Sequence, residues 1–188
     1  MVLKNFIVLE GIDGAGTTTQ QRLLQDKIRA LHPQVPCHST AEPTDGATGR
    51  FLRSVLRGNV HLSPRTVAYL FAADRQEHLA APGGIEELCR SGSLVICDRY
   101  LFSSLAYQSA ACGQELPRLL NSGFPLPASL LFGAGGLGTP LLLCPAGFQR
   151  RLHGPGHRGA KQSVASRLGG RLCPGLVLKF HWFSFVND

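Results

Sequence analysis

The chain has 188 residues, 44% of them hydrophobic, and a formal net charge of +7 at pH 7. That length suits one domain with a sizeable core, and the charge alone admits nucleic acid or a membrane surface as partners. Eleven of the twelve acidic residues lie at or before Glu115, however, so residues 1–115 have mixed charge and the remainder is basic and rich in glycine.

Three sequence features bear on the cellular setting. The six cysteines form no C-x-x-C pair, which argues against a zinc site and a disulfide framework and favours the cytoplasm. The apolar run at residues 6–9 is too short for a signal peptide. Residues 119–149 carry no charge, but their four prolines and six glycines would leave backbone groups unpaired in lipid, so we expect no membrane span there.

The first elements surround a glycine-rich loop. Residues 5–10 form a short apolar run, which predicts a buried parallel strand. The loop at residues 11–16 follows. Residues 17–31 then place leucine and isoleucine on one face and precede Pro33, which predicts a helix. Strand, glycine loop and helix are the context that a phosphate-binding loop requires.

The same reasoning predicts further alternating elements. These are strands over 35–40 and 93–97, and helices over 48–57, from Ser63-Pro64 to about 79, 82–90 and 103–112. Alternation of this kind predicts an α/β fold with a parallel sheet covered by helices. Ligands of such sheets bind beyond the carboxyl ends of the strands, where the glycine loop and Asp98-Arg99 fall.

The pattern deteriorates after residue 132. Residues 129–132 begin another strand, glycines at 133–138 interrupt it, and 176–183 is the only strand-like run of the tail. We therefore predict a core at 1–132 and an atypical basic, Gly/Pro-rich tail at 133–188 that is irregular, incomplete or disordered. Because residues 116–187 contain no carboxylate, our hypothesis is that the tail is out of frame, through a frameshift near residue 133.

The loop itself nearly matches the pattern G-x-x-x-x-G-K-[ST], with Thr17 where the pattern has lysine. Glycine-loop N–H groups and the helix N-terminus cradle phosphate oxygens, and the Thr18 hydroxyl would bind Mg²⁺. Without the lysine, the β- and γ-phosphates lose a full charge, so we expect a large loss of rate unless another cation substitutes. The alternative is a glycine turn without a ligand. The expected phosphate-binding residues are Gly11, Ile12, Asp13, Gly14, Ala15, Gly16, Thr17 and Thr18.

Five motifs together resemble bacterial thymidylate kinases in order and spacing, over about residues 4–132. They are "FIVLEGIDGAG", "EPTDG", "LSPRTVAYLFAADR", "VICDRY" and "SSLAYQ". The resemblance implies the three-layer P-loop fold of nucleoside monophosphate kinases. It also implies transfer of the γ-phosphoryl group of ATP to dTMP with Mg²⁺, in a cytoplasmic homodimer without a nucleic-acid or membrane partner.

The resemblance further implies roles for matched residues. Arg53, Arg75 and Arg99 would hold the dTMP phosphate, because guanidinium forks fit phosphate oxygens. Phe71 would stack on thymine. The remaining roles are Tyr107 beneath the sugar, Ser104 and Gln108 near the base, Glu42 in the loop over the acceptor, Asp13 near the transferring phosphate, and Asp98 with Thr18 on Mg²⁺.

Each role has a plainer alternative. Phe71 can be a core residue, Arg53 a solvated helix residue, Tyr107 a packing residue, and Asp98-Arg99 a structural ion pair. Residues 149–157 faintly resemble the arginine helix and lid of the family, so Arg150 or Arg151 could replace the missing lysine charge. The catalytic candidates are thus Asp13, Arg99, Arg150 and Arg151.

Two other functions compete with an active kinase. One is a non-catalytic remnant of the family that binds dTMP without turnover, because its loop has no lysine and its C-terminal part is aberrant. The other is a basic nucleic-acid-binding protein, which the net charge favours but no recognised motif supports.

Overall fold

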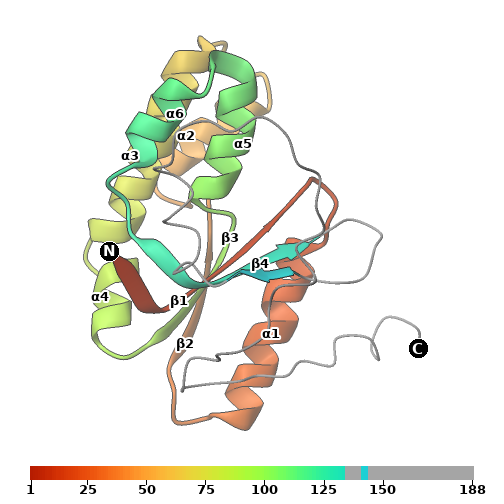
Figure 1. Cartoon of the computed structure of the whole chain (residues 1–188), viewed down its shortest axis with the longest axis vertical. Coiled ribbons are helices and arrows are strands. Elements are labelled where there is room, and N and C mark those ends of the chain that lie inside the picture. Colours follow the sequence, from red (N-terminus) through yellow and green to blue (C-terminus); the bar gives the residue numbers. More distant parts are fainter. Residues whose placement is uncertain (134–140, 144–188) are drawn as a thin grey trace, which may run out of the picture.

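A five-stranded sheet in the order β2-β3-β1-β4-β5 forms the centre of the computed structural model, which describes residues 1–133 and 141–143 (Figure 1). The first four strands are parallel, and β5 is antiparallel to β4. The predicted parallel sheet is therefore confirmed. The strands are β1 (Val2–Gly11), β2 (Cys37–Ala41), β3 (Leu94–Asp98), β4 (Leu126–Gly133) and β5 (Leu141–Leu143).

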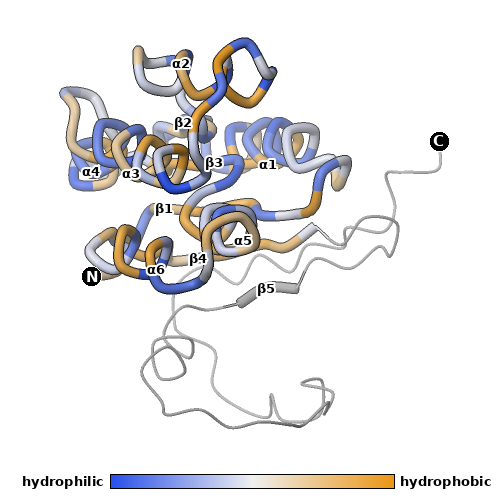
Figure 2. The backbone as a smooth tube through the Cα atoms, turned by 90° about the horizontal axis from the view of Figure 1, so that it is seen from above, coloured by the Kyte–Doolittle hydropathy of each residue, from blue (hydrophilic) through white to orange (hydrophobic). Residues whose placement is uncertain are grey.

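Helices cover both faces of this sheet, which gives three layers. In Figure 2, α1 lies on one side of the sheet and α3 and α4 lie on the other. The helices are α1 (Thr17–Leu31), α2 (Ala47–Leu56), α3 (Pro64–Ala80), α4 (Ile85–Arg90), α5 (Leu101–Cys112) and α6 (Glu115–Asn121).

Alternation along β1 divides the core in two. Phe6 and Val8 pack in a cluster with Leu79 of α3, whereas Leu9 packs on the other face with Leu24 of α1. Successive side chains of a strand point to opposite faces, so one apolar run serves both helix layers. Each fully buried side chain of this size contributes about 1.5–3 kcal/mol, which anchors β1 and the loop that follows it.

Most predicted elements are present, with small shifts at their ends. The helix predicted over 17–31 has those bounds, and the Ser63 hydroxyl caps α3 by accepting the Thr66 N–H at 3.2 Å. The helix predicted over 82–90 begins only at Ile85, because a turn in which Gly84 N–H bonds Ala81 O at 2.7 Å precedes it.

Three features differ from the predictions. First, the structure contains α6, where no helix was predicted. Strand β4 begins at Leu126 rather than 129, and the β1–β4 register shifts between Leu3 and Ile7, so an irregular pairing accommodates Pro127. The view that 176–183 is the only strand-like run of the tail is wrong, because residues 141–143 form β5. Three leucines are too short a run to signal a strand. Residues 176–183 lie outside the described residues.

The segment weighed as a membrane span begins in α6 and continues into β4. Among the residues that the structure describes, no helix has the length and apolar character needed to cross a membrane.

Candidate active site

The carboxyl ends of three neighbouring strands meet at one edge of the sheet. The glycine loop follows β1, Asp98 ends β3, and Glu42 follows β2. Backbone bonds tie these ends together, since Glu42 N–H donates to Asp98 O at 3.1 Å and Arg99 N–H donates to Leu9 O at 2.8 Å. The predicted meeting of the glycine loop and the 98–99 turn is confirmed.

The glycine spacing of the loop has a structural reason. Gly14 and Gly16 have φ values of 80° and 74°, in the left-handed region that favours glycine. A side chain on Gly11 would lie 2.9 Å from Ala15 Cβ and 3.0 Å from Gly133 O. Helix α1 begins at Thr17 without a side-chain cap, so its first N–H groups are suited to hold an anion.

The side chains of Thr18 and Asp98 meet at this edge of the sheet. The Thr18 hydroxyl donates to Asp98 Oδ2 at 2.6 Å. Asp98 is buried, and its Oδ1 has no hydrogen-bond partner among the described residues. A buried carboxylate oxygen without a partner is costly unless a ligand satisfies it. Carboxylate and hydroxyl oxygens are suitable ligands for Mg²⁺.

Arg99 bridges the 98–100 turn and the glycine loop. Its Nη2 donates to Asp13 Oδ1 at 2.7 Å and its Nη1 to Gly11 O at 3.0 Å. Its guanidinium also lies 5.7 Å from the centre of the Tyr107 ring. Burial alone would lower the pKa of Arg99, but the hydrogen bond to Tyr107 and the charge of Asp13 outweigh it and raise that pKa.

Arg75 lies in a buried network and is 1% exposed. Its Nε and Nη2 donate to Glu42 Oε2 at 2.9 and 2.6 Å. Its Nη2 also donates to Ser104 Oγ at 3.0 Å, and its Nη1 donates to Asn121 Oδ1. The structure thus brings together three predicted site residues, and the Arg75 fork is occupied by Glu42. The role of Arg75 on a phosphate stays a prediction.

Sequence reasoning missed two members of this network. His78 Nδ1 lies 3.2 Å from Glu42 Oε1, and its Nε2 lies 2.6 Å from Thr40 Oγ1. The signal for His78 is its position one turn after Arg75 on the same helix. Asn121 comes from α6, a segment without a periodic apolar pattern.

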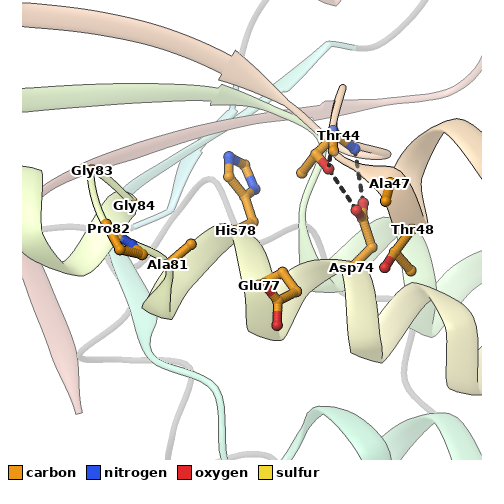
Figure 3. A pocket seen from close by; sticks show the side chains of 11 residues that line it. Thr44, Ala47, Thr48, Asp74, Glu77, His78, Ala81, Pro82, Gly83 and Gly84 are labelled. Carbon is orange, nitrogen blue, oxygen red and sulfur yellow. Dashed lines mark hydrogen bonds between the residues drawn. The ribbon is translucent and has the colours of Figure 1, made fainter.

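Arg53 lies at the 43–45 segment and is more exposed than Arg75. It pairs with Asp45 and donates to Pro43 O at 2.6 Å. Asp74 of α3 holds the same segment, because its carboxylate accepts from Thr44 N–H at 2.8 Å and from the Thr44 hydroxyl at 2.6 Å (Figure 3).

Phe71 and Gln108 lie on the two helices that flank the Arg75 network. Phe71 is half-buried on α3, one turn before Arg75. Gln108 is 7% exposed, one turn after Ser104 on α5, and its Oε1 has no partner among the described residues. A buried amide oxygen of this kind suits an N–H donor of a ligand. Arg150 and Arg151 lie outside the described residues.

A cavity of about 510 Å³ lies along α3, where Asp74, Glu77 and His78 line it (Figure 3). The rest of its lining is Thr44, residues 46–48 and residues 81–84. The predicted site residues are not part of its lining within the described chain. The cavity therefore lies beside the Glu42 end of the edge, since His78 contacts Glu42 at 3.2 Å, and no residue of the glycine loop lines it.

Glu10, near the end of β1, is bonded to the start of α5, although the sequence analysis did not single it out. It is 2% exposed, and its Oε1 accepts from Tyr100 N–H at 3.0 Å and Ser103 N–H at 3.2 Å. The Ser103 hydroxyl donates to Oε2 at 2.5 Å. Burial raises the pKa of Glu10 from 4.5 to about 7. The sequence feature that could have identified Glu10 is a carboxylate at the end of an apolar run, directly before the glycine loop.

Glu10→Gln is expected to remove a pH-dependent loss of stability. Because the folded-state pKa of about 7 exceeds the ordinary 4.5, the folded protein keeps this proton where the unfolded chain releases it. Glu10 therefore destabilises the fold progressively as pH rises from 4.5 to 7, by about 3 kcal/mol in full. Urea denaturation measures the free energy of unfolding of both proteins. The value for Glu10→Gln minus that for the original protein should rise by about 2–3 kcal/mol from pH 5 to pH 8.

The matched control is Glu115→Gln, at an exposed glutamate in the first turn of α6. Its stability relative to the original protein should stay constant over the same pH range. A Glu10→Gln difference that is equally constant would show that Glu10 does not bind a proton in this range.

The comparisons with known proteins identify the family of the chain. The family model described as thymidylate kinase matches residues 9–134. A putative thymidylate kinase of Treponema pallidum is 45% identical over 131 residues, which are 70% of this chain and 62% of that protein. A probable thymidylate kinase of Methanocaldococcus jannaschii is 45% identical over 111 residues, which are 59% of this chain and 53% of that protein.

A solved structure is similar as well. The crystal structure of thymidylate kinase from Ehrlichia chaffeensis matches 70% of this chain and 72% of its own, with a TM-score of 0.62 and 28% identity. The chain spans 62% and 53% of the length of the two curated relatives above. The loop, the strand order and the matched family model together place the chain in the thymidylate kinase family, with its P-loop fold.

Proposed function

We propose that this protein transfers the γ-phosphoryl group of ATP to dTMP, giving ADP and dTDP. The observation that carries this proposal is the Thr18–Asp98 hydrogen bond of 2.6 Å beside the glycine loop, with Asp98 Oδ1 buried and unpartnered among the described residues. The names of the similar proteins support the choice of dTMP as acceptor.

In this proposal the donor phosphates bind at the loop. The N–H groups of residues 14–18 and the N-terminus of α1 hold the phosphate oxygens and orient them. Thr18 and Asp98 fit a divalent cation, which when bound would neutralise charge on the β- and γ-phosphates. Asp13, on the exposed side of the loop, accepts a hydrogen bond from Arg99 and so fixes the arginine beside the reacting phosphates.

The acceptor lies between α3 and α5 in the same proposal. Phe71 stacks on thymine, and Ser104 and Gln108 bond its polar edge from one face of α5. Tyr107 lies beneath the sugar, and Arg53 and Arg99 take the 5′-phosphate as forks. Arg75 is paired with Glu42, and the two side chains are only 1% and 3% exposed.

The test is ADP release by the purified full-length protein with Mg-ATP, with and without dTMP. We expect release to depend on dTMP. Asp98→Asn should lower it by about 10²–10³-fold, because it removes a charge from the cation site. Release without dTMP dependence, or an Asp98→Asn variant as fast as the original protein, would contradict the proposal. A folded protein without any release would favour a binding remnant.

We also propose a cytoplasmic homodimer formed through the N-terminal helices. Exposed apolar side chains on α2 and α3 support this surface, namely Phe51, Leu56 and Tyr69 at 42%, 58% and 53% exposed. Sedimentation equilibrium should give twice the monomer mass, and Leu56→Glu should shift it toward the monomer. A monomeric original protein at tens of micromolar would contradict the dimer.

A further inference from the structure

His78 joins the cavity along α3 to the buried network of Arg75. Its ring lines the cavity and points from α3 toward the strands (Figure 3). Its Nδ1 lies 3.2 Å from Glu42 Oε1, and its side chain is 10% exposed. A side chain outside the predicted site therefore contacts a residue of that site.

The two contacts of the His78 ring determine which nitrogen carries the hydrogen. An ionised carboxylate only accepts, so Nδ1 is the N–H that donates to Glu42 Oε1. In the neutral ring Nε2 then accepts, and the Thr40 hydroxyl donates to it at 2.6 Å. Thr40 is itself fixed in the sheet, because it pairs with Cys97 of β3 and its carbonyl accepts from Gln21 Nε2 at 2.6 Å. The ring is thus held between a strand and Glu42.

Glu42 uses its two oxygens for different partners. Oε2 accepts from Arg75 at 2.9 and 2.6 Å, and Oε1 accepts from His78. The last torsion of a glutamate side chain is soft, so a carboxylate with both oxygens held turns less readily than one held by a single oxygen. Arg75 in turn donates to Ser104 Oγ at 3.0 Å, on the helix expected to contact the acceptor. The position of Ser104 is thereby linked to the His78 contact.

This group of side chains is nearly closed to solvent. The Arg75 and Glu42 side chains are 1% and 3% exposed, and Ser104 is buried as well. Where water has little access, a lost hydrogen bond is not readily replaced. Removal of one partner of Glu42 should therefore affect the others.

We propose that His78 is a positioning residue for the acceptor, because it holds Glu42 so that Arg75 and Ser104 keep the arrangement that binds dTMP. His78 does not touch the acceptor itself. The inference rests on the proposed function for the identity of the acceptor. A residue that only stabilises the fold would not distinguish between the two ring nitrogens in its effect on dTMP.

Two substitutions separate the contacts of the ring. His78→Asn keeps an N–H donor at the place of Nδ1, whereas His78→Gln places its amide near the position of Nε2. Isothermal titration of the full-length protein with dTMP, without ATP, measures the affinity. We expect His78→Gln to weaken dTMP binding about tenfold, the usual effect of losing a hydrogen bond to a charged group, and His78→Asn to weaken it about threefold or less. The control is His61→Gln, at an exposed histidine, which should leave the affinity unchanged.

Chemical rescue tests the same contact without a new side chain. His78→Ala opens a space that adjoins the cavity, so free imidazole can enter it. At about pH 9 imidazole is neutral and carries an N–H, whereas N-methylimidazole has none. We expect millimolar imidazole to raise the dTMP affinity of His78→Ala about threefold or more, and N-methylimidazole to leave it unchanged.

Three results would overturn the inference. They are equal losses for His78→Asn and His78→Gln, equal effects of imidazole and N-methylimidazole, and no dTMP binding by the original protein. Where circular dichroism shows that a variant of one experiment does not fold, the other experiment decides.

The proposed function fails separately. Recovery of dTMP affinity by imidazole, in a protein that releases no ADP, would retain the His78 inference and reject the kinase reaction. The reverse result is dTMP-dependent ADP release in which His78→Gln leaves the KM for dTMP unchanged. It would retain the reaction and reject the inference, which expects a raised KM for dTMP and an unchanged KM for Mg-ATP.

Discussion

Arg75→Met is expected to lower the free energy of unfolding by about 3–5 kcal/mol, the cost of leaving a buried partner charge uncompensated. The Arg75 and Glu42 side chains are 1% and 3% exposed, and the two are joined by two hydrogen bonds. Without the guanidinium, the Glu42 carboxylate retains only the His78 imidazole, 3.2 Å away, as a side-chain partner among the described residues. Urea denaturation at neutral pH measures the loss.

Arg53→Met is the matched control, because the Arg53–Asp45 pair has side chains 34% and 94% exposed. Such a pair contributes about 0–1 kcal/mol. The double variant Glu42→Gln/Arg75→Met should recover part of the stability, since it removes the orphaned charge. An Arg75→Met loss as small as that of Arg53→Met would show that the buried network does not stabilise the fold.

Thr17→Lys is expected to raise the rate of dTMP-dependent ADP release by about tenfold or more. A well-placed charge at a transferring phosphoryl group typically contributes about 3–4 kcal/mol. The increase should appear in kcat, because the charge acts most strongly where negative charge develops. Steady-state ADP release at saturating dTMP and Mg-ATP is the measurement.

Thr17→Gln separates charge from size, because glutamine extends from the same position without a charge. It should be no faster than the original protein. If the Thr17→Lys and Thr17→Gln variants gave the same rate, the missing lysine charge would not limit the proposed reaction, and the reason for the loop's departure from the usual pattern would lie elsewhere.

The sequence predicted the parts of the fold that depend on local pattern. An apolar run before the glycine loop identified β1, and leucine and isoleucine at helical spacing after it identified α1. Ser63-Pro64 identified the start of α3. The meeting of the loop and the 98–99 turn followed from the rule that parallel strands share a carboxyl edge. For these individual elements a few adjacent residues carry enough information to decide the structure.

The remainder depends on contacts between distant residues. The Arg75 network joins residues up to 46 positions apart, and Asn121 comes from a helix that has no amphipathic pattern. In the sequence, Glu10 is only the last residue of an apolar run. Its bonds to Tyr100 and Ser103 form only when β1 and β3 pair. The predictions for Arg150 and Arg151 and for the tail fall outside the described residues.

Formation of dTDP is the most direct test of the central claim. Excess full-length protein is mixed with Mg-ATP labelled in the γ-phosphoryl group and with dTMP, and the labelled products are separated. We predict that the label appears in dTDP in the same amount as ADP. Label released as inorganic phosphate, or retained in ATP by protein that circular dichroism shows to be folded, would contradict the assignment of this chain as a dTMP-phosphorylating enzyme.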